Sequence, residues 1–220
     1  MTRNINDIMR TALYDGRFYK GTIKDFGPLG NDASFSSPPP ILQKTGKSIK
    51  EACFSDAPQD GQAIVVPVIL AGTFTIEMII RIAKVSSGQE RFFEAINIAA
   101  RLHSGGSNIY WECGVGLFRA GMTYPFEAHI IFTRDASNDG YIYENGILKV
   151  SGAVGSDDST GSLYLGSGRS LTHHIDGNIA IASVYDTHIT AEEASLLYEH
   201  SRILIAPGST KRSGIISRAV

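Results

Sequence analysis

The sequence predicts an all-β fold, in which two antiparallel sheets pack as a jelly-roll sandwich with one short C-terminal helix. Three observations support this. Apolar and polar residues alternate over strand-length stretches, as from Phe74 to Ile82. Turn-forming residues separate these stretches, among them Asn145-Gly146, which suits the tightest link between antiparallel strands. A helix signal occurs late in the chain, where Thr190 precedes an apolar run.

The first long predicted strand is 74–82, with one apolar face. Further strand-like runs cover 92–102 and 109–118. The run 129–133 is expected to pair with 140–144 across a short turn rich in Asp and Asn. Many strands with short turns favour two packed antiparallel sheets.

The hairpin and the helix carry the most specific local signals. Asn145 and Gly146 are expected at positive φ, in the centre of a type I′ turn. The Gly-, Ser- and Asp-rich stretch 151–161 predicts a loop. Thr190, followed three residues later by a glutamate, predicts a capped helix that runs to about Arg202 and buries Leu197.

The composition indicates one globular domain, because sandwiches of 220 residues commonly form single domains. The net charge of -2 gives no basic field for nucleic acid, and no apolar run approaches the length of a membrane span. Cys53 and Cys113 are expected to be reduced, because the N-terminus lacks the apolar core of a secretory signal. A disulfide between them stays open, and Cys113 is expected as a small buried side chain.

Four motifs follow one another in the C-terminal half: YENGIL from Tyr143, LYLG from Leu163, DGNIAIASVYD from Asp176 and TAEEASLLY from Thr190. In this order they resemble the hairpin, the two strands and the helix of laminin G-like domains in the concanavalin A-like lectin/glucanase superfamily. The resemblance extends upstream to about residue 11. It implies the fold rather than an activity, because the family is functionally diverse.

The extent of the resemblance predicts a sandwich at residues 11–202, an N-terminal arm at 1–10 and a C-terminal arm at 203–220. Most laminin G-like domains are expected outside cells. A chain that begins with Met and lacks a secretory signal needs another way out, such as release by lysis as part of a virus particle.

No catalytic or cofactor-binding residue is predicted. The glucanase branch of the superfamily places paired carboxylates on one strand as E-x-D-x-x-E, whereas Glu90 and Glu94 lack the central Asp. We expect these two glutamates on one strand face, at a solvated edge and strand entrance. Ser167 follows a strand and precedes no helix, so it forms no nucleophile elbow. No phosphate-binding loop occurs in the sequence.

No metal site is predicted either. His173 and His174 are expected in a polar loop, since adjacent strand residues point to opposite faces. Some laminin G-like domains bind calcium at the rim, and Asp157-Asp158 and the 135–139 loop carry oxygen ligands of the kind calcium prefers. The same residue types favour turns for conformational reasons, and that interpretation is preferred.

Trp111, the only tryptophan, could stack on a sugar or fill the core. Strand alternation favours the core and places three further residues on the inner side with it: Ile109, Cys113 and Val115. Tyr110 and Glu112 then face outward.

Three classes of function compete. The first is a structural bacteriophage virion protein, either a capsid decoration or a tail- or fibre-associated module, that acts as a homo-oligomer or with other virion proteins. It would be made in the host cytoplasm without a signal peptide, and apolar residues such as Ile8 and Ile215 in its arms would need a surface to cover. The second is a carbohydrate-binding lectin module for cell-surface glycan, which overlaps with the first. A glycan hydrolase or lyase is disfavoured by the missing carboxylates.

Overall fold

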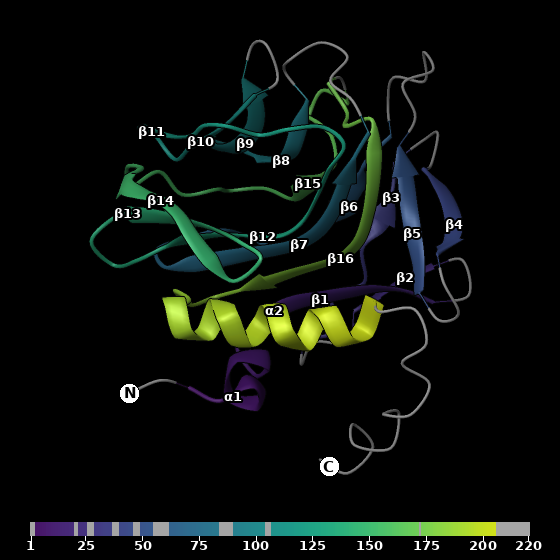
Figure 1. Cartoon of the computed structure of the whole chain (residues 1–220), viewed down its shortest axis with the longest axis horizontal. Coiled ribbons are helices and arrows are strands. Elements are labelled where there is room, and N and C mark those ends of the chain that lie inside the picture. Colours follow the sequence, from purple (N-terminus) through teal and green to yellow (C-terminus); the bar gives the residue numbers. More distant parts are fainter. Residues whose placement is uncertain are drawn as a thin grey trace.

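The computed structural model is a sandwich of two antiparallel sheets with helices on one outer side (Figure 1). This arrangement confirms the predicted fold class. The structure describes residues 3–19, 22–25, 29–36, 40–45, 49–54, 62–83, 90–103, 107–171 and 173–205. Within these ranges, no helix combines the length and the apolar character needed to cross a membrane.

Sheet A contains nine of the described strands, with β7 and β16 near its centre. Seven of them lie in the order β14 (Ile147–Ala153), β13 (Asp139–Glu144), β12 (Phe126–Arg134), β7 (Phe74–Ile82), β16 (Gly177–Tyr185), β1 (Ala12–Tyr19) and β2 (Thr22–Asp25). In addition, β5 (Ile49–Phe54) pairs with β16, and β4 (Ile41–Thr45) pairs with β5. The predicted pairing of 129–133 with 140–144 is confirmed, since Ile131 lies opposite Tyr143 in the β12–β13 ladder.

Sheet B contains the other seven described strands. They lie in the order β11 (Gly116–Arg119), β10 (Asn108–Glu112), β9 (Ile98–His103), β8 (Arg91–Ala95), β15 (Leu163–Leu165), β6 (Ile64–Val66) and β3 (Ser34–Phe35). The chain passes from β7 in sheet A to β8–β11 in sheet B and then back to β12. Both sheets therefore need each other to bury their inner faces.

The core between the sheets is built around aromatic side chains. Trp111 is fully buried and meets Phe74 edge to face at 6.4 Å and Phe132 at 5.7 Å between ring centroids. Phe93 contacts Phe132 in the same way at 5.1 Å. Such edge-to-face pairs add to the energy of apolar burial. The prediction that Trp111 belongs to the core is confirmed.

Two helices, α1 (Ile5–Met9) and α2 (Ala191–Ile205), cover the outer side of sheet A (Figure 1). Ile8 of α1 and Leu197 of α2 are buried in a second apolar cluster on this side. The predicted N-terminal arm at residues 1–10 contains α1, which begins at an Asn4 cap and packs on its own sandwich. The domain boundaries at residues 10 and 202 stay predictions.

Helix α2 also docks on a buried charge. Glu77 of β7 accepts hydrogen bonds from Tyr185 Oη at 2.6 Å and Ser201 Oγ at 2.9 Å, and its Oε1 lies 2.7 Å from His129 Nε2. Burial alone would raise the pKa of Glu77, but His129, Tyr185 and Ser201 hold this pKa below its ordinary value. Strand β7 has the predicted apolar face, and Thr75, Glu77 and Ile79 on its other face are buried as well, because α2 lies over Glu77.

The hairpin and helix predictions are confirmed. Asn145 and Gly146 have φ angles of 53° and 77°. Thr190 Oγ1 accepts a hydrogen bond from Glu193 N at 3.4 Å, and Glu193 Oε2 accepts one from Thr190 N at 3.0 Å, which is a capping box. The helix continues to Ile205, beyond the expected end near Arg202.

Two strand predictions, one side-chain orientation and one loop boundary need correction. The run 92–102 is divided between β8 and β9 by a turn at Asn97, whose φ is 65°. The run 109–118 is divided between β10 and β11 near Gly114, whose φ is 102°. This turn also leaves Val115 54% exposed rather than inside the core. The predicted loop 151–161 begins later, because β14 extends to Ala153.

Cys113 is free and buried, as expected for a small core side chain. Burial raises the pKa of its thiol to about 12, so thiolate chemistry is suppressed. The Cys53 side chain and residues 206–220 of the predicted C-terminal arm lie outside the described residues.

Candidate functional site

The outer side of sheet B is free of any described helix, whereas α1 and α2 cover the outer side of sheet A (Figure 1). We call the outward side chains of its first four strands the β8–β11 face. They are Arg91, Glu94, Ala99, Arg101, His103, Asn108, Tyr110, Glu112, Gly116 and Phe118.

Strand alternation builds this face. In β10, Ile109 and Trp111 are buried in the core, so Tyr110 and Glu112 point outward, as the sequence predicted. In the two neighbouring ladders Tyr110 lies opposite both Arg101 of β9 and Phe118 of β11. Residues that lie opposite one another share a face of the sheet, so these side chains form one row.

Three rings form what we call the aromatic ledge. The centroids of Tyr110 and Phe118 are 4.5 Å apart, and His103 lies 5.3 Å from Phe118 and 6.2 Å from Tyr110. Phe118 is 50% exposed. A ring that is half exposed on a strand and held by two other rings offers a prepared apolar surface.

Gly116 determines how the ledge lies. A Cβ at this position would be 2.0–2.2 Å from atoms of the Tyr110 ring and hydroxyl, so the side chain of Tyr110 covers the Gly116 backbone. Burial and a hydrogen bond to Glu112 raise the pKa of the Tyr110 hydroxyl, which therefore remains protonated at neutral pH. The glycine and the glutamate together fix the ring against the sheet.

Charged groups surround the ledge. The guanidinium carbon of Arg101 lies 5.1 Å from the Tyr110 ring centroid, a cation–π distance. On β8, Arg91 Nε lies 3.3 Å from Glu94 Oε2. The Glu94 carboxylate also accepts a hydrogen bond from the backbone N–H of Arg169 at 3.2 Å.

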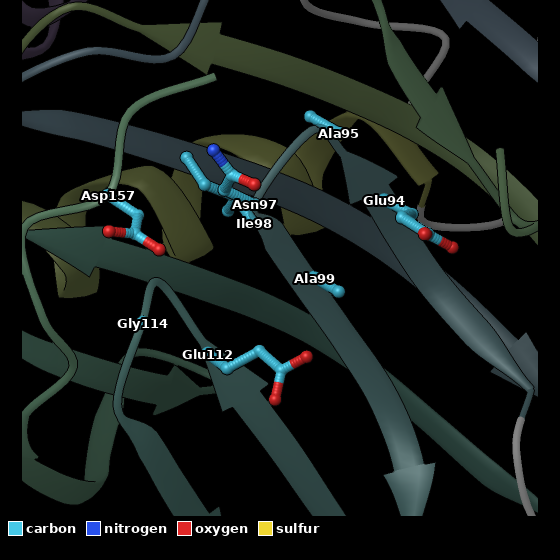
Figure 2. Close-up of a pocket in the computed structure, with 8 residues that line it drawn as sticks. All are labelled: Glu94, Ala95, Asn97, Ile98, Ala99, Glu112, Gly114 and Asp157. Atoms are coloured by element: carbon cyan, nitrogen blue, oxygen red, sulfur yellow. The ribbon is translucent and has the colours of Figure 1, made fainter.

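A hollow of about 320 Å³ adjoins this face at the turns between β8 and β9 and between β10 and β11 (Figure 2). We call it the acidic hollow; its lining residues are Glu94, Ala95, Asn97, Ile98, Ala99, Glu112, Gly114 and Asp157. Figure 2 shows that its polar groups come from separate segments: Asn97 from a turn, Glu112 from the end of β10 and Asp157 from the loop that follows β14. The positive φ angles of Asn97 and Gly114 shape the two turns.

The chemistry of this region suits a polyhydroxylated ligand. Carboxylates accept and amides both donate and accept hydrogen bonds, which matches sugar hydroxyls. Aromatic rings pack against the C–H surface of a sugar by dispersion. In the part of the chain that the structure describes, no three His, Cys, Asp or Glu side chains are placed to hold a metal ion.

The oxygen-rich loops considered for calcium serve the protein's own hydrogen bonds. Asp135 accepts hydrogen bonds from Ser137 N at 2.8 Å, Asp139 N at 3.0 Å and Tyr141 Oη at 3.0 Å, as an aspartate in a turn commonly does. Asp158 accepts from Gly72 N at 2.9 Å.

Asp158 also accepts from the buried Arg134 at 2.6 Å. Arg134 donates further to the Gly72 carbonyl at 2.7 Å and the Asp157 carbonyl at 2.5 Å. These hydrogen bonds hold the loop that contains Asp157 and Asp158 against β12 of sheet A.

Glu90 and Glu94 do not share a face. A β-bulge between Arg91 and Phe93 changes the alternation, so Glu94 faces outward while Glu90 is completely buried. The expectation of a solvated Glu90 is therefore wrong. His173 and His174 lie in an irregular loop, as predicted, and Ser167 lies in a turn after β15.

Strand alternation predicted the outward orientation of Tyr110 and Glu112. No sequence motif pointed to the other members of the β8–β11 face, such as Arg101, His103 and Phe118. Asn97 and Gly114, both at positive φ, divide the runs 92–102 and 109–118. Asparagine and glycine commonly mark turns, so these two residues could have indicated the strand boundaries.

Comparison with known proteins agrees with the fold. The chain resembles the binding domain of paraclostridial mosquitocidal protein 1, with a TM-score of 0.69 and 13% identity over 88% of this chain and 53% of that one. It also resembles botulinum neurotoxin type C, whose cell entry depends on interaction with two ganglioside molecules, with a TM-score of 0.71 and 11% identity over 90% of this chain and 53% of that one. A third similar structure is the ligand-binding domain of botulinum neurotoxin serotype D in complex with N-acetylneuraminic acid, with a TM-score of 0.69 and 14% identity over 89% of this chain and 52% of that one.

At these identities the likeness shows the fold alone, and the chain spans about half the length of these structures. No curated protein matches the chain. The family model described as the concanavalin A-like lectin/glucanases superfamily matches residues 58–195. On this match, which covers more than half of its length, the chain belongs to the concanavalin A-like lectin/glucanases superfamily.

Proposed function

We propose that this chain is a non-enzymatic binding module that recognises a cell-surface glycan with its β8–β11 face. The observation that carries the proposal is the aromatic ledge beside the acidic hollow, on the side of the sandwich that no described helix covers. Convergent polar groups next to a prepared apolar surface are typical of small-ligand sites.

The two parts of the site have complementary roles. Phe118 and Tyr110 offer ring faces for the apolar side of one sugar. Glu112 and Asn97 provide acceptors and a donor for hydroxyl groups of the same or the next sugar. Because the face is open along the strands, it suits a chain of sugars.

Two of the similar structures support this proposal through the ligands that they bind. The type C neurotoxin interacts with gangliosides and the serotype D domain binds N-acetylneuraminic acid, and both are sugar ligands. The shared fold makes a glycan a reasonable first ligand to test for this chain.

The non-enzymatic part of the proposal rests on the carboxylates. Glu94 and Glu112 are separated by one intervening strand, β9, which places their Cα atoms about 10 Å apart. Glu94 already forms an ion pair with Arg91 and accepts a hydrogen bond from the Arg169 backbone. Glycoside hydrolysis, by contrast, uses two carboxyl groups that are free to act on the scissile bond.

Glycan binding can be tested with a glycan array followed by calorimetric titration of the best ligand. We expect Phe118→Ala to weaken binding about tenfold, the equivalent of about 1.4 kcal/mol. The matched control is Leu196→Ala, which removes a 42% exposed apolar side chain from α2 on the other side of the molecule.

An equal loss of glycan affinity in Phe118→Ala and Leu196→Ala would mean that the β8–β11 face is not the binding site. Absence of any glycan ligand would contradict the proposal as a whole. Release of reducing sugar from a bound polysaccharide would contradict its non-enzymatic part.

We also propose, from the sequence, that the module is displayed on a bacteriophage virion and works by assembly. Three exposed apolar side chains near the β13–β14 hairpin and α2 support association with a partner: Ile147, Leu148 and Leu196. Light scattering of the full chain tests self-association, and mass spectrometry of purified particles tests display. A monomeric chain at high concentration would contradict self-association, and absence of the chain from purified particles would contradict display on the virion.

A further inference from the structure

The β8–β11 face contains two arginines directly opposite each other. Arg91 of β8 pairs with Arg101 of β9 in the ladder. Like charges placed opposite each other on neighbouring strands destabilise a sheet. Burial is the largest cause that lowers the pKa of Arg91; the charge of Glu94 raises this pKa, and the charge of Arg101 lowers it by a smaller amount. The fold therefore tolerates an electrostatic repulsion at the centre of the candidate site.

The two arginines differ in their partners. Arg91 has Glu94 within ion-pair distance, at 3.3 Å. Arg101 contacts the ring of Tyr110, and among the described residues no carboxylate forms an ion pair with it. A guanidinium stacked on a ring keeps its edge available for a planar anion such as a carboxylate.

Resting on the proposed function, we propose that Arg101 binds the carboxylate of an acidic sugar, so that the module selects glycans with sialic or uronic acid residues. The ring of that sugar lies on the aromatic ledge, and Arg91 adds positive charge behind Arg101. This assigns the selectivity of the face to one residue.

The neighbouring acidic groups fix the orientation of such a ligand. Glu94, Glu112 and Asp157 line the hollow and repel an anion placed there. Arg101 lies two residues along β9 from Ala99 of the hollow, a distance of about 7 Å. A sugar ring of comparable size can therefore direct its carboxylate to Arg101 and its hydroxyls to the hollow.

The positive charge of Arg101 and the negative charges of the acidic hollow therefore favour one orientation of the ligand, with its carboxylate at Arg101. His103 and Tyr110 stand beside Arg101 on the same face. A neutral sugar fits the ledge but leaves Arg101 without an anionic partner. Arg101 is only partly buried, so the contribution of its charge interaction falls as salt concentration rises.

The test compares matched pairs of oligosaccharides: a sialylated glycan with its desialylated form, and a uronate-containing glycan with its carboxyl-reduced form. Affinities for the full chain are measured at low and high salt. We expect each acidic glycan of the preferred class to bind about tenfold more tightly than its neutral partner, and this preference to shrink at high salt. Which of the two pairs shows the preference identifies the acid.

The variant Arg101→Gln should abolish the difference in affinity between each acidic glycan and its neutral partner. Arg202→Gln, on α2, is the matched control and should retain the preference, because its guanidinium pairs with Glu199 on the other side of the molecule. Circular dichroism establishes that both variants are folded.

Three results would overturn the inference. Equal binding of acidic and neutral partners to the unmodified chain, or an undiminished preference in Arg101→Gln, would refute the role of Arg101 but leave glycan binding standing. Absence of binding to every glycan would refute the proposed function and this inference together.

Discussion

The ion pair between Arg3 and Glu193 provides a stability prediction that can be worked from the structure. Arg3 Nε and Nη2 donate to the two carboxylate oxygens of Glu193 at 2.8 and 2.9 Å, and the Arg3 backbone N–H donates at 3.1 Å. Arg3 also donates to Thr187 Oγ1 and the His188 carbonyl. These bonds hold the segment before α1 against the first turn of α2.

The magnitude follows from the pKa of Glu193. Burial alone would raise this pKa, but the hydrogen bonds from Arg3 and Thr190 and the charge of Arg3 lower it from 4.5 to about 2. A difference of this size corresponds to at most about 3 kcal/mol at neutral pH. The Arg3 side chain is 29% exposed, and solvent screens the ion pair. We therefore expect the pair to contribute about 2 kcal/mol to the free energy of unfolding.

The sign of the pH dependence follows from the same values. Because the pKa of Glu193 is lower in the folded state, its contribution is complete above pH 4.5 and is lost as the pH falls towards 2. We therefore expect Glu193→Gln to lower the free energy of unfolding by about 2 kcal/mol at pH 7 and by about 1 kcal/mol near pH 3.

Urea denaturation followed by the fluorescence of the buried Trp111 measures this free energy. Glu199→Gln is the control, because Glu199 pairs with Arg202 on the exposed side of α2 and should cost less than about 0.5 kcal/mol. Equal effects of the two substitutions at pH 7, or an effect of Glu193→Gln that stays constant down to pH 3, would refute the reasoning.

Three further substitutions test other parts of the structure. Gly146→Val should lower stability by more than the 1–2 kcal/mol typical of a left-handed residue, measured by thermal denaturation, because a Cβ there would also lie 3.0 Å from Ser195 Cα; an unchanged melting temperature would contradict this. Thr190→Ala should cost about 0.5–2 kcal/mol in urea denaturation through loss of the helix cap, and a neutral effect would show that the cap is dispensable. Gly116→Ala should displace the Tyr110 ring and weaken glycan binding in calorimetry while the fold persists; full binding by a folded variant would disprove the importance of the ring position.

The features that the sequence predicted well depend on short-range interactions. The type I′ turn at Asn145-Gly146 and the capping box of Thr190 each involve residues within four positions of one another. The inward orientation of Trp111 followed from strand alternation alone. Such features are encoded locally, so the fold class could be predicted.

The features that the sequence did not predict depend on long-range partners or on single turn residues. Glu77 is buried because α2 lies over it, more than a hundred residues later in the chain. The β-bulge near Arg91 reverses the expected orientation of Glu90. The β8–β11 face arises only when β9, β10 and β11 pair side by side, which no single motif reveals.

The central claim, that the β8–β11 face binds a glycan, is tested most directly by NMR titration of the labelled chain with the preferred glycan from the array. We predict that the backbone amide signals of Arg101, Tyr110 and Phe118 shift progressively as glycan is added, while those of α2 stay unchanged. Shifts confined to α2 and sheet A, or no shifts at saturating glycan, would contradict it.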